Sequence, residues 1–250
     1  MSSYLRDHHQ LIRAALENFN HDFFKENRIV FGGGTRIALE LNEYRESIDI
    51  DFLCPDKLSF RAVRLETTEK SLGNLVKEDF YYPREIRADR DAVRCFIEIE
   101  STPIKLEFVS FADYNLQIDP TNPFKVPALS RSSCYLTKLL ANADRYANSP
   151  YKDIFDILAM FSHWGEIPND AWNDADTHYG KTLVFKNLKK SCEHINAHIT
   201  NYLEIATNQL DINPAYAKQL LQVTNQEFLN YLNELEKTLL NTSAPQRTVL

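Results

Sequence analysis

Residues 28–53 read RIVFGGGTRIALELNEYRESIDIDFL, a stretch that passes from an extended pattern to a helical one and back. A short apolar run from Arg28 to Phe31 predicts a strand, and the glycines that follow predict a break in the chain. Residues 35–43 have the spacing of a short helix. Residues 47–53 alternate apolar and polar side chains, as a half-buried strand does. This order returns the chain to the sheet beside the point where it left.

Asp49 and Asp51 lie two residues apart in the second of these strands. Side chains alternate across a strand, so both carboxylates point to one face while Ile48, Ile50 and Phe52 face the core. Adjacent carboxylates repel each other unless a cation lies between them. Mg2+ takes oxygen ligands and binds through one or two carboxylates together with substrate phosphates. The pair therefore predicts a magnesium site for phosphoryl transfer.

The glycine turn leads directly from a predicted strand into a predicted helix. Glycines let the backbone approach a phosphate closely, and the N–H groups at a helix N-terminus favour anions. We therefore expect Gly33, Gly34 and the hydroxyl of Thr35 to bind nucleotide phosphates. A D-x-D or a glycine triplet alone is more often a solvated strand face or a simple turn, and it is their combination in this order that is specific.

A third acidic side chain is expected near the aspartates. Residues 92–100 and 103–110 predict a hairpin of two further strands. Glu107 lies on the second of them, and in an antiparallel neighbour of the D-x-D strand it would complete the metal site or act as a general base. Glu98 and Glu100 share one strand face and are alternatives for that role. A solvated strand residue explains Glu107 equally well.

The remaining pattern divides the chain into two parts. Residues 114–130 contain three prolines and read as a connector, after which strand patterns stop. Helical spacing is found at residues 5–26, 59–78, 132–147, 151–163, 181–208 and 214–240. We predict an α+β fold, with a small mixed sheet in a domain of residues 1–125, a helical domain of residues 126–250, and a cleft between them.

The first motif resembles that of a known family. Gly33-Gly34-Thr35 followed by Arg45-Glu46-Ser47-Ile48-Asp49-Ile50-Asp51-Phe52 is similar to the first motif of the AbiEii/AbiGii toxin family. That family is a branch of the DNA-polymerase-β-like nucleotidyltransferase superfamily. The resemblance implies a nucleotidyltransferase fold for the N-terminal domain and metal binding by the D-x-D pair.

A second block supports the resemblance. Residues 133–145 resemble the family's helix with a lysine followed by an arginine, and residues 151–157 resemble its K-D-x-x-D segment. Thr137 stands where the family usually has serine. The resemblance spans residues 28–160 and implies that Lys138 and Asp153 act at the site.

The spacing within this block has a physical meaning of its own. Lys138 and Arg145 are two helical turns apart and share one face, from which a lysine can hold phosphates as a point charge. Asp153 and Asp156 share a face at positions i and i+3. The alternative is a pair of solvated helix faces with salt bridges such as Lys152 with Asp156. Combined with the first motif, the block predicts nucleotide binding by Lys138 and Arg145.

We therefore predict a nucleotidyltransferase that uses Mg2+, or Mn2+ in its place, to move a nucleoside monophosphate from an NTP to an acceptor. The expected catalytic residues are Asp49, Asp51, Glu107, Lys138 and Asp153, the first three of them as metal ligands. The family resemblance implies a toxin–antitoxin or phage-defence toxin with a cognate antitoxin, acting on tRNA 3′ ends. Alternatives are transfer to a small-molecule or protein hydroxyl, and a non-catalytic nucleotide-binding module.

The net charge and the lack of targeting signals limit the expected partners and location of the protein. The net charge is −7, so a strongly basic nucleic-acid footprint is absent, although a local basic groove is not excluded. Lys186, Lys189 and Lys190 form a small basic patch, either a solvated face or a contact for an RNA backbone. The sequence has four cysteines but no C-x-x-C pair. Its N-terminus lacks a signal-like apolar run, and no stretch has the pattern of a membrane span. These features predict a cytoplasmic protein without a membrane partner.

Overall fold

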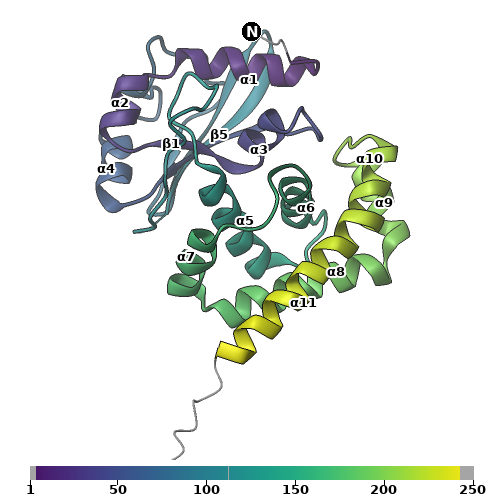
Figure 1. Cartoon of the computed structure of the whole chain (residues 1–250). Coiled ribbons are helices and arrows are strands. Elements are labelled where there is room, and N and C mark those ends of the chain that lie inside the picture. Colours follow the sequence, from purple (N-terminus) through teal and green to yellow (C-terminus); the bar gives the residue numbers. More distant parts are fainter. Residues whose placement is uncertain (1–3, 112, 243–250) are drawn as a thin grey trace, which may run out of the picture.

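The computed structural model describes residues 4–111 and 113–242. A five-stranded sheet with helices against it forms the upper part of Figure 1, and the other helices gather below it. The predicted α+β architecture is confirmed, with the mixed sheet in the first half of the chain. None of the described helices is both long and apolar enough to cross a membrane.

The strands are β1 Val30–Gly32, β2 Asp49–Cys54, β3 Arg87–Ala88, β4 Ala92–Ile99 and β5 Thr102–Ser110, in the sheet order β1-β2-β5-β4-β3. β4 and β5 form the predicted hairpin. In its turn, Glu100 and Ser101 have positive φ angles of 49° and 65°. Two successive positive φ angles are typical of the tight turns whose twist matches that of the flanking strands.

β2 and β5 are neighbours, but they run parallel, so the expectation of an antiparallel neighbour is wrong. Parallel strands need a crossover connection, which residues 55–91 supply by carrying the chain to the far side of the sheet. β5 then returns between β4 and β2. The resulting register sets Asp51 directly beside Glu107 and Asp49 beside Lys105.

One face of the sheet is covered by the helices α1 Asp7–Asn18, α2 His21–Glu26 and α4 Lys57–Glu66. Ile50, Phe52 and Phe108 are fully buried on this face, and the rings of the two phenylalanines stack with centroids 5.2 Å apart. The strand alternation therefore turns Asp49 and Asp51 to the opposite face. Ile48 was expected in this core but is 49% exposed, because it lies in the loop before β2.

Two of the predicted helices are shorter than expected. The pattern over residues 5–26 is interrupted at Phe19, which is extended and packs edge-on against Phe52 with ring centroids 4.7 Å apart. The helix expected over residues 59–78 ends at Glu66 and is followed by a loop with a 3₁₀ turn, Gly73–Leu75. At Phe19, burial of the aromatic ring outweighs the local helical pattern. After Glu66 the chain forms a loop although its spacing is helical.

The remaining helices are α3 Gly33–Glu40, α5 Arg131–Arg145, α6 Lys152–Trp164, α7 Asn169–Tyr179, α8 Lys181–Ala197, α9 Ile199–Asn208, α10 Pro214–Lys218 and α11 Asn225–Thr242, with a π-helical turn Gln219–Thr224 before the last. α7 was not predicted, because its buried face holds only Ala171, Trp172 and Ala175 and gives little apolar periodicity. The helix expected over residues 181–208 breaks at His198.

The two parts of the chain share buried surface. Ile37 of α3 packs in the same hydrophobic cluster as Leu139 of α5 and Phe155 of α6. Val126 and Ala128, which follow the predicted domain boundary, pack instead in the core beneath the sheet. The division at residues 125 and 126 stays a prediction, and the contacts explain how helices from the second part can complete a site on the sheet.

Candidate active site

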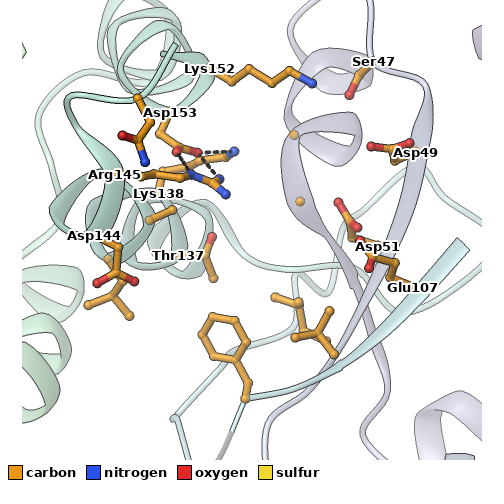
Figure 2. A pocket seen from close by; sticks show the side chains of 18 of the residues that line it. Ser47, Asp49, Asp51, Glu107, Thr137, Lys138, Asp144, Arg145, Lys152 and Asp153 are labelled. Carbon is orange, nitrogen blue, oxygen red and sulfur yellow. Dashed lines mark hydrogen bonds and ion pairs between the residues drawn. The ribbon is translucent and has the colours of Figure 1, made fainter. Parts of the chain in front are cut away.

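A cleft of about 810 Å³ lies between the open face of the sheet and the helices α5 and α6 (Figure 2). β2 and β5 supply one wall, and α5 with the start of α6 supplies the wall opposite. The predicted site residues that line it are Gly33, Gly34, Asp49, Asp51, Glu107, Lys138, Arg145 and Asp153. Thr35 is not among them.

The carboxylates of Asp49 and Asp51 point into the cleft from one strand (Figure 2). Within the described part of the chain, neither carboxylate has a hydrogen-bond or ion-pair partner. Burial raises the pKa of Asp51 to about 6, and repulsion from Asp49 and Glu107 adds to this shift. Among the described residues Lys138 and Lys105 offset this repulsion only in part, and two neighbouring acidic groups without an ion-pair partner are well suited to bind a divalent cation.

Glu107 stands beside Asp51 but is already paired. Its Oε1 accepts a hydrogen bond from Arg94 Nε at 2.8 Å, and its Oε2 lies 2.6 Å from Lys105 Nζ. In residues 4–111 and 113–242 no group of three or more acidic, histidine or cysteine side chains is gathered as metal ligands would be. The pair Asp49 and Asp51 thus offers the better fit to a metal, and a ligand role for Glu107 stays a prediction.

Glu98 and Glu100, the alternatives to Glu107, lie away from the cleft. Glu98 pairs with Pro103 near the hairpin end of β4, and Glu100 belongs to the turn itself. Neither contributes to the lining.

The two glycines leave room for side chains of the site itself. Gly33 has a φ of +68°, and a Cβ added there would overlap the carboxylate of Asp51. A Cβ on Gly34 would overlap Nη2 of Arg45. Both glycines also line the cleft, so the close approach expected for a phosphate is compatible with the geometry.

Thr35 is buried, and its hydroxyl lies between the carbonyl oxygen of Asp49 and the hydroxyl of Ser47, 2.8 Å from the latter. These bonds fasten the N-terminal turn of α3 to the start of β2. The observed contacts therefore position the D-x-D strand, and a direct role of Thr35 at a phosphate stays a prediction.

On the opposite wall, Lys138 is held by two carboxylates. Its Nζ lies 3.0 Å from Asp153 Oδ1 and 2.7 Å from Asp156 Oδ2. Burial alone would lower the pKa of Lys138, but Asp156 and Asp153 raise it above its usual value. Lys138 is therefore a fixed cation facing the two aspartates of β2.

Asp153 is shared between Lys138 and Arg145, whose Nε lies 2.6 Å from Asp153 Oδ2 (Figure 2). Burial would raise the pKa of Asp153, but the two cations lower it. Arg145 keeps 56% of its side chain exposed and borders the cleft. Asp153 thus orients two cations, and the lowered pKa makes it a weak proton acceptor.

The ion pair between Arg45 and Asp156 was not predicted from the sequence, although both residues lie in the two motifs. Arg45 Nε and Nη2 donate to Asp156 at 2.8 Å and 3.1 Å, and the Tyr44 hydroxyl donates to the same carboxylate. Both charged side chains are buried. Attraction to Arg45 and Lys138 outweighs burial and lowers the pKa of Asp156 far below its usual range. The suggested salt bridge of Lys152 with Asp156 is wrong, because Asp156 faces inward and Lys152 borders the cleft.

Residues 14–239 match the family model described as "Nucleotidyl transferase AbiEii toxin, Type IV TA system". The chain belongs to this family. The resemblance read from the two motifs is confirmed, and the match extends through helices beyond residue 160 that carried no motif. The protein is therefore a nucleotidyltransferase of a toxin–antitoxin family, and membership implies an antitoxin partner and a nucleotide substrate.

Two solved structures share the fold of this AbiEii family member. A Helicobacter pylori protein described as a nucleotidyltransferase aligns with a TM-score of 0.56 and 17% identity, over 94% of this chain and 99% of its own. JHP933 from Helicobacter pylori aligns with a TM-score of 0.54 and 17% identity, over 95% and 97%. At such identities the likeness concerns the fold. The comparison with curated protein sequences found no match.

Proposed function

We propose that the protein transfers a nucleoside monophosphate from an NTP to the 3′ end of a tRNA in a Mg2+-dependent reaction. The observation that carries the proposal is the cleft itself, in which the carboxylates of Asp49 and Asp51, without an ion-pair partner among the described residues, face the fixed cation Lys138. Membership of the toxin family supports nucleotidyl transfer as the activity.

Asp49 and Asp51 would hold the metal, because their oxygens match the ligands that Mg2+ and Mn2+ prefer. A bound divalent cation neutralises charge on the phosphates during transfer. Two protein carboxylates are a usual number for Mg2+, whose other ligands are water and substrate oxygens.

The other residues bind and orient the substrates. Lys138 and Arg145 attract the triphosphate from the helical wall, and the backbone at Gly33 and Gly34 leaves space for it beside β2. The oxygen of the acceptor hydroxyl forms a bond to the α-phosphorus and its proton passes to solvent water, while the bond between the α-phosphorus and the oxygen that bridges to the β-phosphorus breaks and pyrophosphate leaves. Glu107 and Asp153, the two candidates for the general base, are each held by two cations. Positioning and charge neutralisation therefore carry most of the rate enhancement.

The test is incubation of the purified protein with each α-labelled NTP and, in parallel samples, total bacterial RNA or a bacterial extract of proteins and small molecules, with Mg2+ or with a chelator. We expect label in small RNA only when Mg2+ is present. Label in a protein or small-molecule fraction instead would favour the alternative acceptors, for which the net charge of −7 is the one supporting feature. Absence of label from every fraction, with nucleotide binding intact, would favour a non-catalytic module.

A further inference from the structure

The open face of the sheet continues beyond the aspartates across β5, β4 and β3. Residues directly opposite each other in a sheet share a face, and the register pairs Glu107 with Arg94 and Arg94 with Arg87. Lys105 and Phe96 are likewise opposite each other on this face. Three strand spacings of about 4.8 Å connect β2 to β3, so the face extends roughly 14 Å from the catalytic strand.

Beyond the aspartates, the basic side chains of this face, Arg84, Arg87, Arg94 and Lys105, outnumber the acidic side chains Asp89, Glu98 and Glu107 by one. Arg94 and Lys105 are engaged with Glu107, and Arg94 also contacts Asp89 at 2.6 Å. Arg84 and Arg87 are exposed, and in the described part of the chain neither has an ion-pair partner. Glu98 is the acidic side chain of β4 on the same face. Two guanidinium groups that have no ion-pair partner among the described residues thus lie at the end of the face away from the cleft.

Arg84 is supported by an aromatic ring. Its guanidinium carbon lies 4.2 Å from the centroid of Phe96, a cation–π contact at a partly exposed site. Guanidinium planes and aromatic rings are the surfaces on which unpaired RNA bases stack. Arg84 and Phe96 together therefore offer a stacking platform, and Arg87 beside them offers a phosphate contact.

We propose that Arg84, Arg87 and Phe96 form an acceptor track, which binds the single-stranded end of an RNA and leads its terminal ribose hydroxyl to Asp49 and Asp51. This inference rests on the proposed function and adds the surface that recognises the acceptor. In the proposed function, Lys138 and Arg145 on the opposite wall of the cleft bind the nucleotide phosphates. The acceptor has to reach the aspartates from another side, and the acceptor track lies on the sheet face that they share.

The basic patch on α8 is less suited to this task. Lys189 pairs with Glu236 at 2.9 Å, and Lys190 lies over the ring of Tyr146 at 5.4 Å. Neither these lysines nor Lys186 lines the cleft. Charge on α8 is thus partly neutralised and separate from the aspartates.

The experiment measures binding of a short fluorescein-labelled single-stranded RNA by anisotropy over a range of salt concentrations. It compares the wild type with Arg84→Ala/Arg87→Ala and with a matched control, Arg61→Ala/Arg64→Ala, which removes the same charge from exposed positions on α4. α4 covers the other face of the sheet. Melting temperatures of the three proteins verify that each is folded.

We expect the track variant to bind RNA at least about tenfold more weakly, as loss of one stacking contact predicts. Its plot of log affinity against log salt should flatten by about 0.7 for each lost phosphate contact. The control should match the wild type. Equal affinity and slope in the track variant and the wild type would overturn the proposal, as would failure of the wild type to bind RNA at all.

A second readout separates this proposal from the proposed function. Stabilisation against melting by NTP with Mg2+ reports on the cleft and should be the same in wild type and track variant. RNA binding that depends on Arg84 and Arg87 without any transfer of label would retain these residues as an RNA-binding surface and reject RNA nucleotidyl transfer, and with it the presentation of an acceptor hydroxyl. If the wild type and the track variant transfer label to RNA at the same rate, the proposed function is retained and the acceptor track is rejected.

Discussion

Arg45 and Asp156 form a two-point buried ion pair between the loop that precedes the D-x-D strand and helix α6, with N–O distances of 2.8 Å and 3.1 Å. Asp156 also binds Lys138, which faces the aspartates across the cleft. One carboxylate thus connects both walls of the site. The distance between the D-x-D pair and Lys138 depends on it.

Replacement of Arg45 by Met should destabilise the protein by about 3–5 kcal/mol, because it leaves a buried carboxylate with one fewer cation. The measurement is the free energy of unfolding in urea. Lys237→Met, which breaks an exposed pair with Glu234, is the control and should change stability by less than about 1 kcal/mol. Similar losses in the two variants would contradict the structural role of Arg45.

Two glycines with positive φ angles differ in the space around them, so replacing each by alanine distinguishes backbone strain from steric overlap. Gly33→Ala and Gly180→Ala both place alanine at a positive φ, +68° and +80°, and the backbone strain alone should cost about 1–2 kcal/mol in each. Only at Gly33 does the new Cβ also meet Asp51, whereas nothing lies within 4 Å at Gly180. Transfer activity should therefore fall in Gly33→Ala and persist in Gly180→Ala. Equal activity of the two folded variants would show that the lack of a side chain at Gly33 is not needed to position the carboxylate of Asp51.

The third prediction concerns Arg145, which is half-exposed and borders the cleft. Loss of one charge-assisted hydrogen bond is worth about 1.5–3 kcal/mol, so Arg145→Ala should raise the KM for NTP about 10- to 100-fold. The melting temperature should also fall, because buried Asp153 then keeps only Lys138 as a cation, so the kinetics are measured at a temperature at which the variant is folded. Steady-state kinetics over a range of NTP concentrations provide the measurement, and an unchanged KM would remove Arg145 from the nucleotide site.

His9 gives a prediction about pH. It is buried, its Nδ1 lies 2.9 Å from Glu43 Oε1, and its Nε2 accepts a hydrogen bond from the Ser47 N–H at 3.1 Å. Burial lowers the pKa of His9, and the opposing effect of Glu43 does not cancel it. The ring is therefore neutral, with its proton on Nδ1.

Because the unfolded chain takes up a proton on this histidine before the folded chain does, stability should fall as the pH drops below about 6.5. The loss continues until the lower pKa of the folded state is reached. His9→Gln removes this group, so its free energy of unfolding should change less between about pH 7.5 and about pH 5.5 than that of the wild type. An identical pH dependence in both proteins would contradict a neutral, buried His9.

Local periodicity was enough to predict much of the fold and of the cleft. Alternation around Ile50 and Phe52 places both aspartates on the open face, because the two-residue period of a strand needs no tertiary information. The direction of β5 beside β2 could not be predicted, since it depends on the route of residues 55–91. Local sequence does not contain that route.

The pairing of Arg45 with Asp156 also lay beyond periodicity, because the two residues are 111 positions apart. A signal was nevertheless present in α6. Ile154, Phe155 and Ile157 surround Asp156 with apolar side chains on several faces of the helix. Such a helix is buried, and a charge within it requires a partner from elsewhere in the fold.

The most direct test of the account is the initial rate of Mg2+-dependent nucleotidyl transfer by Asp49→Asn. Asp91→Asn, which removes an exposed carboxylate beside β4, is the matched control. We predict that Asp49→Asn melts like the wild type and loses transfer by a factor of at least about 100, while Asp91→Asn keeps the wild-type rate. Transfer at the wild-type rate by a fully folded Asp49→Asn would contradict the assignment of the D-x-D pair as the catalytic centre.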